Sequence, residues 1–241
     1  MHEPEAIVRQ VRALWEHETR INLHRYPIAV TLSAGDLIVE GQVEHIIAKK
    51  RALELAASVV GIRGIVDRLR VTPAQAMEDG ELCDHVRDAL LQESALENCS
   101  IRLWDKGKLR TIQDRSASSS ATIDVEINAG VVTLNGNVPS LTHKRIAGVL
   151  VWWVPGSRDV INGLEVVPVQ DDNDDEITDA VRMVLQKNPF VDASQIAIST
   201  RTSVVTLTGS VRNPAEKQMA ECDAWYVFGV DQVSNQLTVR E

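Results

Sequence analysis

NAGVVTLNGNVPSLTHKRIAGVLVWWVPGSRDVINGLEV, residues Asn128–Val166, decides the fold, because the chain contains this pattern three times. It recurs without a gap as Ser33–Val71 and as Arg201–Val239, each 39 residues long. Aligning the three stretches superposes glycines and valines in a fixed order: Gly41, Gly136 and Gly209, then Val43, Val138 and Val211, then Gly61, Gly156 and Gly229. Self-similarity of this kind is typical of a repeated structural unit. The sequence therefore predicts one small domain in three copies.

The hydrophobic pattern gives each unit the order α-β-β-α-β. A helix with one apolar face comes first, as in Ile7, Val11, Leu14 and Trp15. Two strands and a second helix follow, and a closing strand alternates like Val160–Val166. Strands that alternate have only one buried face, so both helices must cover the same side of the sheet. We predict an α+β fold in which each domain is a three-stranded mixed sheet covered on one face by two helices.

The repeat predicts three domains at residues 1–72, 79–168 and 173–241, here called copies one, two and three. Short linkers join them. Copy two contains an insertion near residues 98–121, in which SIRLWDKGKLRTI alternates on both sides of Asp105–Lys108. Alternation around a Gly-containing turn predicts an additional hairpin.

Several recurring residues have structural interpretations. Glycines 41, 136 and 209 fall in the buried phase of a strand, where they predict a bulge or the close approach of a helix. Glycines 61, 156 and 229 stand where a helix C-cap is expected. The run Asp171–Asp175 predicts a helix N-cap rather than a calcium loop, because it lacks the required Gly and Glu. The recurring Asp67, Asn162 and Asn235 predict local hydrogen bonds to the backbone of the last strand.

Composition excludes several classes of protein. With 44% hydrophobic and 24% charged residues, the 241-residue chain is not disordered, and a net charge of −9 disfavours nucleic-acid binding. Its three cysteines are odd in number and stand at unequal repeat positions, which predicts free thiols rather than disulfides or a zinc site. No apolar run approaches the roughly 20 residues of a transmembrane helix. The first residues do not form a secretory signal, so we expect a cytoplasmic protein.

Two pairs of aromatic residues are the most unusual local feature. Trp152-Trp153 and Trp225-Tyr226 stand late in the second helix of copies two and three, where copy one has Ala57-Ser58. Adjacent residues point about 100° apart on a helix, so both rings of a pair cannot be deeply buried in one small core. Three interpretations stay open: packing between domains or chains, a surface for a ligand or membrane, and plain core. We expect at least one ring of each pair to contact another domain.

Basic residues in copy one form a second candidate site. Their positions are Lys49, Lys50, Arg51, Arg63, Arg68 and Arg70. Such a cluster could attract anionic lipid headgroups or an acidic partner. The alternative is a solvated face whose charges are balanced by neighbouring acids.

No set of residues has the pattern of a catalytic centre. The sequence lacks a nucleophile–base–orienter combination and a phosphate-binding GxGxxG turn between strand and helix. Its six histidines form no metal-ligand spacing. We therefore expect no enzymatic activity and no cofactor, although a monovalent cation held by backbone carbonyls would leave no side-chain signature.

The repeat resembles the BON family, a bacterial module named for an osmotic-shock-inducible periplasmic protein and nodulation proteins. The similarity rests on G-x-V-T-L-x-G-x-V at Gly130–Val138 and on G-V-x-x-V-x-N-x-L-x-V at Gly229–Val239. It covers nearly the whole chain except the insertion and the linkers. The resemblance implies a role in osmotic stress responses through binding of anionic phospholipid or other envelope components or, as in one cytoplasmic member, of potassium. Many members are periplasmic, whereas the absence of a signal sequence here favours a cytoplasmic role.

The resemblance and the residues together predict a non-catalytic binding or scaffold protein. A protein partner or self-association is expected to use the aromatic pairs. The alternatives are a peripheral binder of anionic membrane and a potassium sensor. Replacing Trp153 and Tyr226 by Ser should leave the individual domains folded while loosening their association.

Overall fold

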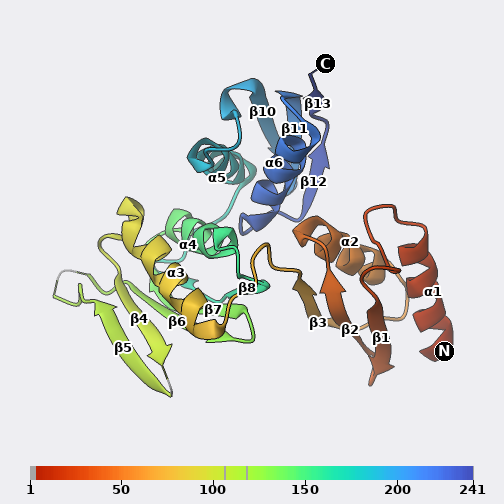
Figure 1. The fold of residues 1–241 in the computed structure, drawn as a ribbon, viewed down its shortest axis with the longest axis horizontal. Helices are drawn as coiled ribbons and strands as arrows, with labels where there is room; N and C mark the ends of the chain where they lie inside the picture. Colours follow the sequence, from red (N-terminus) through yellow and green to blue (C-terminus); the bar gives the residue numbers. More distant parts are fainter. Residues whose placement is uncertain (1–3, 106, 118, 241) are drawn as a thin grey trace. The chain divides into compact units, whose positions relative to one another are not determined.

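A computed structural model describes residues 4–105, 107–117 and 119–240. The chain divides into two compact units, Met1–Thr72 and Pro73–Glu241, so copy one forms the first unit and copies two and three form the second (Figure 1). Lys106 in the predicted hairpin turn and Ser118 in the predicted insertion lie outside the described residues.

Copy one has the predicted order of elements. They are α1 (Pro4–Glu16), β1 (Ile28–Ser33), β2 (Asp36–Val43), α2 (Ile46–Ala57) and β3 (Gly64–Val71). The strand order is β1-β2-β3, with β1 antiparallel and β3 parallel to the central β2. A hairpin places β2 beside β1, and the crossover through α2 returns β3 parallel to β2. The sheet is therefore mixed, as predicted.

The core of copy one lies between the sheet and its two helices. Trp15 at the end of α1 is fully buried, and its indole N–H donates to the backbone carbonyl of Ala52 on α2 at 2.9 Å. Leu37 and Val39 on β2 are fully buried beneath the helices, whereas Val66 on β3 is 40% exposed. Alternation of this kind leaves the other face of the sheet open to solvent.

Copy two repeats these elements and adds the insertion. Its elements are α3 (Asp79–Gln92), the 3₁₀ turn η1 (Ser94–Leu96), β4 (Ser100–Asp105), β5 (Lys108–Gln113), β6 (Thr122–Asn128), β7 (Val131–Val138), α4 (Leu141–Trp153), β8 (Asp159–Asn162) and β9 (Glu165–Val166). The sheet order is β5-β4-β6-β7-β8, with β9 also pairing with β7. Strands β4 and β5 form the predicted hairpin, and β4 joins the sheet parallel to β6.

Copy three lacks the insertion. Its elements are α5 (Asp174–Lys187), the 3₁₀ turn η2 (Ala193–Gln195), β10 (Ile196–Arg201), β11 (Val204–Val211), α6 (Pro214–Tyr226), β12 (Gln232–Asn235) and β13 (Thr238–Val239). The order is β10-β11-β12, with β13 also parallel to β11. The closing strand is thus one continuous strand in copy one and two shorter strands in copies two and three.

The recurring strand glycines have the same place in all three sheets, but their role differs from the prediction. Gly41, Gly136 and Gly209 lie opposite the first isoleucine of the preceding strand. At Gly136 (φ +111°), an added Cβ would lie 2.4 Å from the carbonyl oxygen of Thr122. The neighbouring strand, not a helix, approaches these glycines closely. A positive φ at the end of the central strand brings the two backbones together, and only glycine leaves room for that.

Helix ends agree only partly with the sequence analysis. Asn173 caps α5 by accepting from the backbone N–H of Glu176 at 3.0 Å, which confirms the predicted N-cap. The predicted C-caps at glycines 61, 156 and 229 are wrong, because the C-caps of α2, α4 and α6 are Ser58, Val154 and Val227. In α4 the N–H of Val154 bonds back to Val151, closing a tighter last turn before the glycine is reached.

The predicted backbone hydrogen bonds of the last strand are confirmed. The side-chain oxygens of Asp67, Asn162 and Asn235 each accept from the backbone N–H two residues later, at 2.9, 3.4 and 3.2 Å. In copies two and three the side-chain amide also donates to the preceding helix, at the carbonyls of Lys144 and Lys217. This residue therefore ties the closing strand to the second helix.

Candidate functional site

The two aromatic pairs meet where copy two packs on copy three. Trp152 and Trp153 are the last residues of α4, and Trp225 and Tyr226 are the last residues of α6. The rings of Trp152 and Tyr226 stack with centroids 5.0 Å apart and planes 13° from parallel. Trp225 is buried, with 7% of its surface exposed. Figure 1 shows α4 beside α5 and α6, so this contact lies within the second unit.

Asp223 on α6 lies at the centre of the contact. Its carboxylate accepts the indole N–H of Trp153 at 2.8 Å and the side-chain amide of Asn188, at the end of α5, at 2.6 Å. The residue is 1% exposed. Burial raises the pKa of Asp223 to about 6, and the two hydrogen bonds oppose that rise because they favour the charged form.

The groups beside this carboxylate are buried as well. Burial, followed by the charges of Asp223 and Glu221, raises the pKa of the Cys222 thiol to about 12. The pKa of Tyr226 is also raised, mainly by burial and then by Cys222 and Asp223. A thiol with so high a pKa stays protonated at neutral pH and is a poor nucleophile. The hydrogen bonds of Asp223 join α4, α5 and α6 around these buried groups.

Polar contacts surround the aromatic centre. Arg145 on α4 is 3% exposed, and its guanidinium contacts both carboxylate oxygens of Asp172 at 2.5 and 2.6 Å. It also donates to the carbonyl of Phe228 at 2.9 Å, so one side chain joins copy two, the linker and copy three. Lys187 is the last residue of α5 in copy three, and its ammonium lies 2.9 Å from the carboxylate of Glu93, which follows α3 in copy two.

We call this set of contacts the junction. Its residues are Glu93, Lys144, Arg145, Trp152, Trp153, Asp172, Lys187, Asn188, Asp223, Tyr226 and Phe228. Two of the four predicted aromatic residues stack on each other, and a third binds Asp223. Copy one has Leu55, Ala57 and Ser58 at the positions of Asp223, Trp225 and Tyr226. Its equivalent helix therefore has neither the aromatic pair nor the carboxylate.

Sequence reasoning missed a lysine that changes its contact at the junction. Lys49, Lys144 and Lys217 occupy one repeat position. In copies one and three the ammonium donates to the carbonyl of the closing strand, at Leu69 (2.9 Å) and Leu237 (2.5 Å). In copy two Lys144 instead lies 3.9 Å from the ring centroid of Phe228, a cation–π contact with copy three. Recurrence of lysine in the alignment was a signal that could have revealed the position.

Lys49 does not lie on the surface where the basic cluster was predicted. It is 4% exposed, and its ammonium lies 2.9 Å from the carboxylate of Asp67 as well as from the carbonyl of Leu69. The neighbouring Lys50 is half-buried. A buried, paired ammonium cannot contact a lipid headgroup without breaking those bonds.

The four arginines of the predicted cluster also have protein partners. Arg51 contacts Glu18 at 2.6 Å and Glu54 at 2.7 Å, and Arg63 contacts Asp36 at 2.9 Å. The hydrogen bond from Arg63 holds the pKa of Asp36 below its usual value. Arg68 lies 3.7 Å from Glu40 on β2, and Arg70 donates to the carbonyl of Leu69. Arg63 and Arg68 remain exposed, and each exposed charge has an acid beside it.

Two further observations concern ligands and membranes. Among the described residues, no group of three or more His, Cys, Asp or Glu side chains is placed to hold a metal ion. Within the same ranges, none of the helices has the length and apolar character required to cross a bilayer.

Comparison with known proteins agrees with the repeated fold. The family model of the BON domain matches residues 17–73, 108–168 and 173–241, which together make up most of the chain. The chain belongs to the BON domain family. No curated protein matches the sequence. The first match begins after α1, and the second begins at β5, beyond α3 and β4.

Two solved structures are similar over nearly their full length. One is the C-terminal domain of CdsD, the structural protein of the type III secretion system of Chlamydia trachomatis. It is 11% identical with a TM-score of 0.26, and 98% of each chain is covered. A second CdsD structure is 12% identical with a TM-score of 0.24, covering 98% of this BON chain and 93% of the other. TM-scores this low carry no argument about function.

Proposed function

We propose that this BON protein is a non-catalytic binding and scaffold protein that acts through protein partners or further copies of itself. Copies two and three serve as one binding unit, and copy one is a separate module on the same chain. From the family, we assign it to stress or osmotic adaptation.

The junction is the observation that supports a scaffold. Three of the aromatic residues that could have formed a ligand surface are engaged between α4 and α6, by stacking and by the bond to Asp223. A buried carboxylate with two donors requires a defined geometry, because separating the donors leaves the carboxylate unpaired. Such a contact fixes the spacing of two domains, which is what a scaffold needs.

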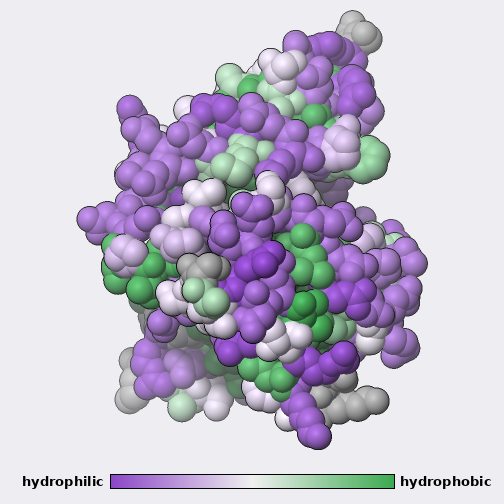
Figure 2. Space-filling view, turned by 90° about the vertical axis from the view of Figure 1, so that its left-hand side faces the viewer, coloured by the Kyte–Doolittle hydropathy of each residue, from purple (hydrophilic) through white to green (hydrophobic). Residues whose placement is uncertain are grey.

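The charge distribution favours binding to an anionic membrane less than it favours a scaffold role. The exposed Arg63 and Arg68 are paired with Asp36 and Glu40, which reduces the positive potential available to anionic lipid. On the face of the molecule drawn in Figure 2, hydrophobic areas are small and separated by hydrophilic surface. Surface of this kind is ordinary for a protein that works in water.

The test compares the full chain with a double variant, Trp153→Ser with Tyr226→Ser. Three measurements are made on both: affinity capture with direct titration of any captured protein, co-sedimentation with phosphatidylglycerol vesicles, and thermal unfolding in KCl against NaCl. We expect a protein that binds the unaltered chain directly and binds the double variant at least tenfold more weakly. Each removed ring should cost the junction about 1–3 kcal/mol.

The alternatives predict different results. Saturable binding to phosphatidylglycerol vesicles, without a protein partner, would replace the scaffold with a peripheral membrane binder. An increase in unfolding temperature in KCl alone would replace it with a potassium sensor, because a ligand that binds only the folded state raises its stability. A partner that binds both proteins equally would show that the junction is not involved in the binding.

A further inference from the structure

The same edge of the sheet has a neighbouring strand in copy two, whereas in copies one and three it is the end of the described sheet. In copy two the outer edge of β6 is occupied by β4, which lies parallel to it from Ser100 opposite Thr122 to Leu103 opposite Val125. The hairpin that supplies β4 is the insertion found only in this copy. The equivalent strands in copies one and three are β1 and β10, because Ile28, Ile123 and Ile196 occupy the same repeat position. This edge of the domain can therefore accept an additional strand.

In copy one this edge has no neighbouring strand in the described part of the chain. β1 is the first strand in the order β1-β2-β3, and no strand among residues 4–105, 107–117 and 119–240 pairs with its outer side (Figure 1). Its sequence, IAVTLS, contains no charge and no proline. Ala29, Thr31 and Ser33 face the open side of the sheet and are exposed. An edge strand presents unpaired backbone N–H and C=O groups, which form a template for another strand.

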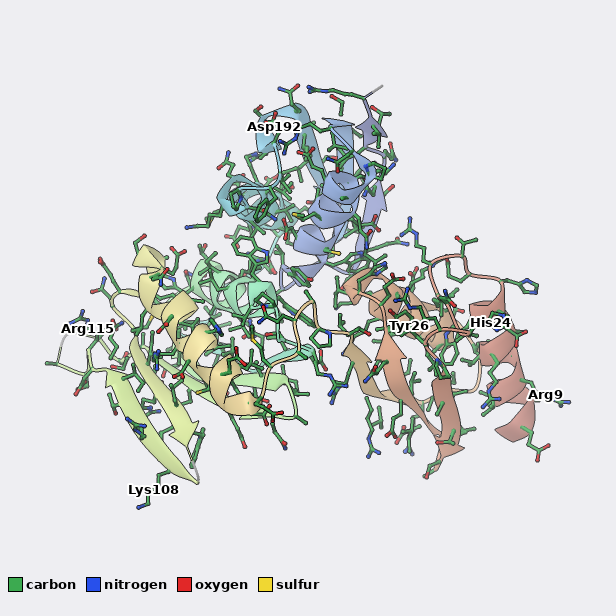
Figure 3. All side chains as sticks on the ribbon, in the orientation of Figure 1. Arg9, His24, Tyr26, Lys108, Arg115 and Asp192 are labelled. Atoms are coloured by element: carbon green, nitrogen blue, oxygen red, sulfur yellow. The ribbon has the colours of Figure 1, made fainter. Side chains whose placement is uncertain are left out.

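Most other edges of this molecule have features that prevent such pairing. β3 contains Asp67, Arg68 and Arg70, and the closing strand of copy three is broken between β12 and β13. β5 begins with Lys108, which projects away from the hairpin in Figure 3, and a register irregularity separates its end from β4. Charges, interruptions and bulges are the usual protection of an edge. β1 has none of these three features.

We propose that β1 is a self-association surface and pairs antiparallel with β1 of a second copy of this chain. The inference rests on the self-association included in the proposed function and identifies the surface that carries it. A neutral strand can face itself without placing like charges together, whereas β3 would bring arginine near arginine. Antiparallel pairing about a two-fold axis uses the same surface on both molecules and closes as a dimer. The two three-stranded sheets then form one continuous sheet.

The pleat limits the register of this dimer. Directly opposite residues must point to the same face, so the central pair is Val30 opposite Val30 or Thr31 opposite Thr31. In either register the two Thr31 side chains lie directly or diagonally across from each other on the exposed face. Long charged side chains at this position would reach each other in both cases.

The experiment measures the mass of the full chain in solution over a range of concentrations, by size exclusion with light scattering. The unaltered protein should reach twice its monomer mass of 26.6 kDa. Thr31→Lys and Thr31→Glu should each remain monomeric, because the variant places like charges across the pair. An equal mixture of the two variants should recover the doubled mass, since Lys then faces Glu. The matched control is Ser199→Lys, at the same position on β10, which should leave the dimer intact.

Each result decides the proposal. Because Thr31 is exposed, the variants should keep the circular-dichroism spectrum of the unaltered protein, which checks that they are folded, while loss of the dimer lowers their unfolding temperature. A monomeric unaltered protein, a dimeric Thr31→Lys variant, or a mixture that stays monomeric would overturn the β1 dimer. Those outcomes leave the scaffold role intact if the partner titration through the junction succeeds. If the titration fails while dimerisation depends on the charge at residue 31, the partner-binding part of the proposed function is overturned and the β1 dimer stands.

Discussion

Replacing Trp153 by Phe tests the junction most directly. The substitution keeps an aromatic ring but removes the indole N–H that lies 2.8 Å from the carboxylate of Asp223. A hydrogen bond to a charged group contributes about 1.5–3 kcal/mol, and a neutral one about 1 kcal/mol. We therefore expect the free energy of unfolding to fall by about 1.5–3 kcal/mol at pH 8, where Asp223 is ionised.

The same variant has a predicted pH dependence. Asp223 has a pKa of about 6 in the folded protein, compared with about 3.9 in an unfolded chain. Above pH 6 both states are ionised, and burial of the charge costs roughly 3 kcal/mol. As pH falls from 6 toward 4, the folded state binds the proton first, so stability increases in that window. At pH 5 the carboxyl group is mostly neutral, and Trp153→Phe should cost only about 1 kcal/mol.

The assay is urea unfolding of the full chain at pH 8 and pH 5, with Trp104→Phe as the matched control. Trp104 lies on β4 and is 46% exposed, so Trp104→Phe makes the same chemical change outside the junction. Because loss of ring burial does not depend on pH, the change in the Trp153→Phe loss between pH 8 and pH 5 isolates the bond to Asp223. Equal losses for both variants, or a loss for Trp153→Phe that is the same at both pH values, would refute the reasoning.

Three further substitutions test other contacts by urea unfolding. Trp152→Ala removes the stack on Tyr226 and should destabilise copies two and three by about 2–4 kcal/mol, from the lost ring contact and burial. Lys49→Met leaves its carbonyl and carboxylate partners unmatched and should lower the stability of copy one by about 1–3 kcal/mol. Gly136→Ala places a Cβ 2.4 Å from a carbonyl at positive φ and should cost more than about 2 kcal/mol, whereas Gly80→Ala, in helix α3 with nothing within 4 Å, should stabilise by up to about 1 kcal/mol. A tolerated Gly136→Ala would show that the strand can shift.

Sequence alone was sufficient for the architecture, because periodicity and repetition are local signals. The alternation of VVTLNGNV specifies a strand with one buried face, and the spacing of apolar residues before it specifies a helix. Because the three copies align without a gap, each element expected in one copy has equivalent residues in the other two. The insertion hairpin was predicted from the same alternation. Its parallel pairing with β6 was not, because the register of distant strands has no local signature.

The sequence also identified the aromatic pairs as unusual and predicted a contact with another domain, but it did not identify the residues they contact. That Trp153 binds Asp223, and that Trp152 stacks on Tyr226, depends on the packing of α4 against α6, 70 or more residues apart. Nor could the sequence show which residues of the basic cluster are buried. Lys49 points into the domain because its position on α2 faces β3, while Arg51 two residues later reaches Glu18.

The limits of local information are clearest at Lys49, Lys144 and Lys217. One repeat position holds the same residue in all three copies, and the sequence gives no reason for different contacts. Tertiary structure decides, because in copy two the Phe228 ring of copy three lies at the ammonium, where copies one and three have the strand carbonyl. Secondary structure follows from the chain's own periodicity, which each residue carries with it. The partner of a charged or aromatic side chain depends on which surfaces meet, and that is decided when the domains pack.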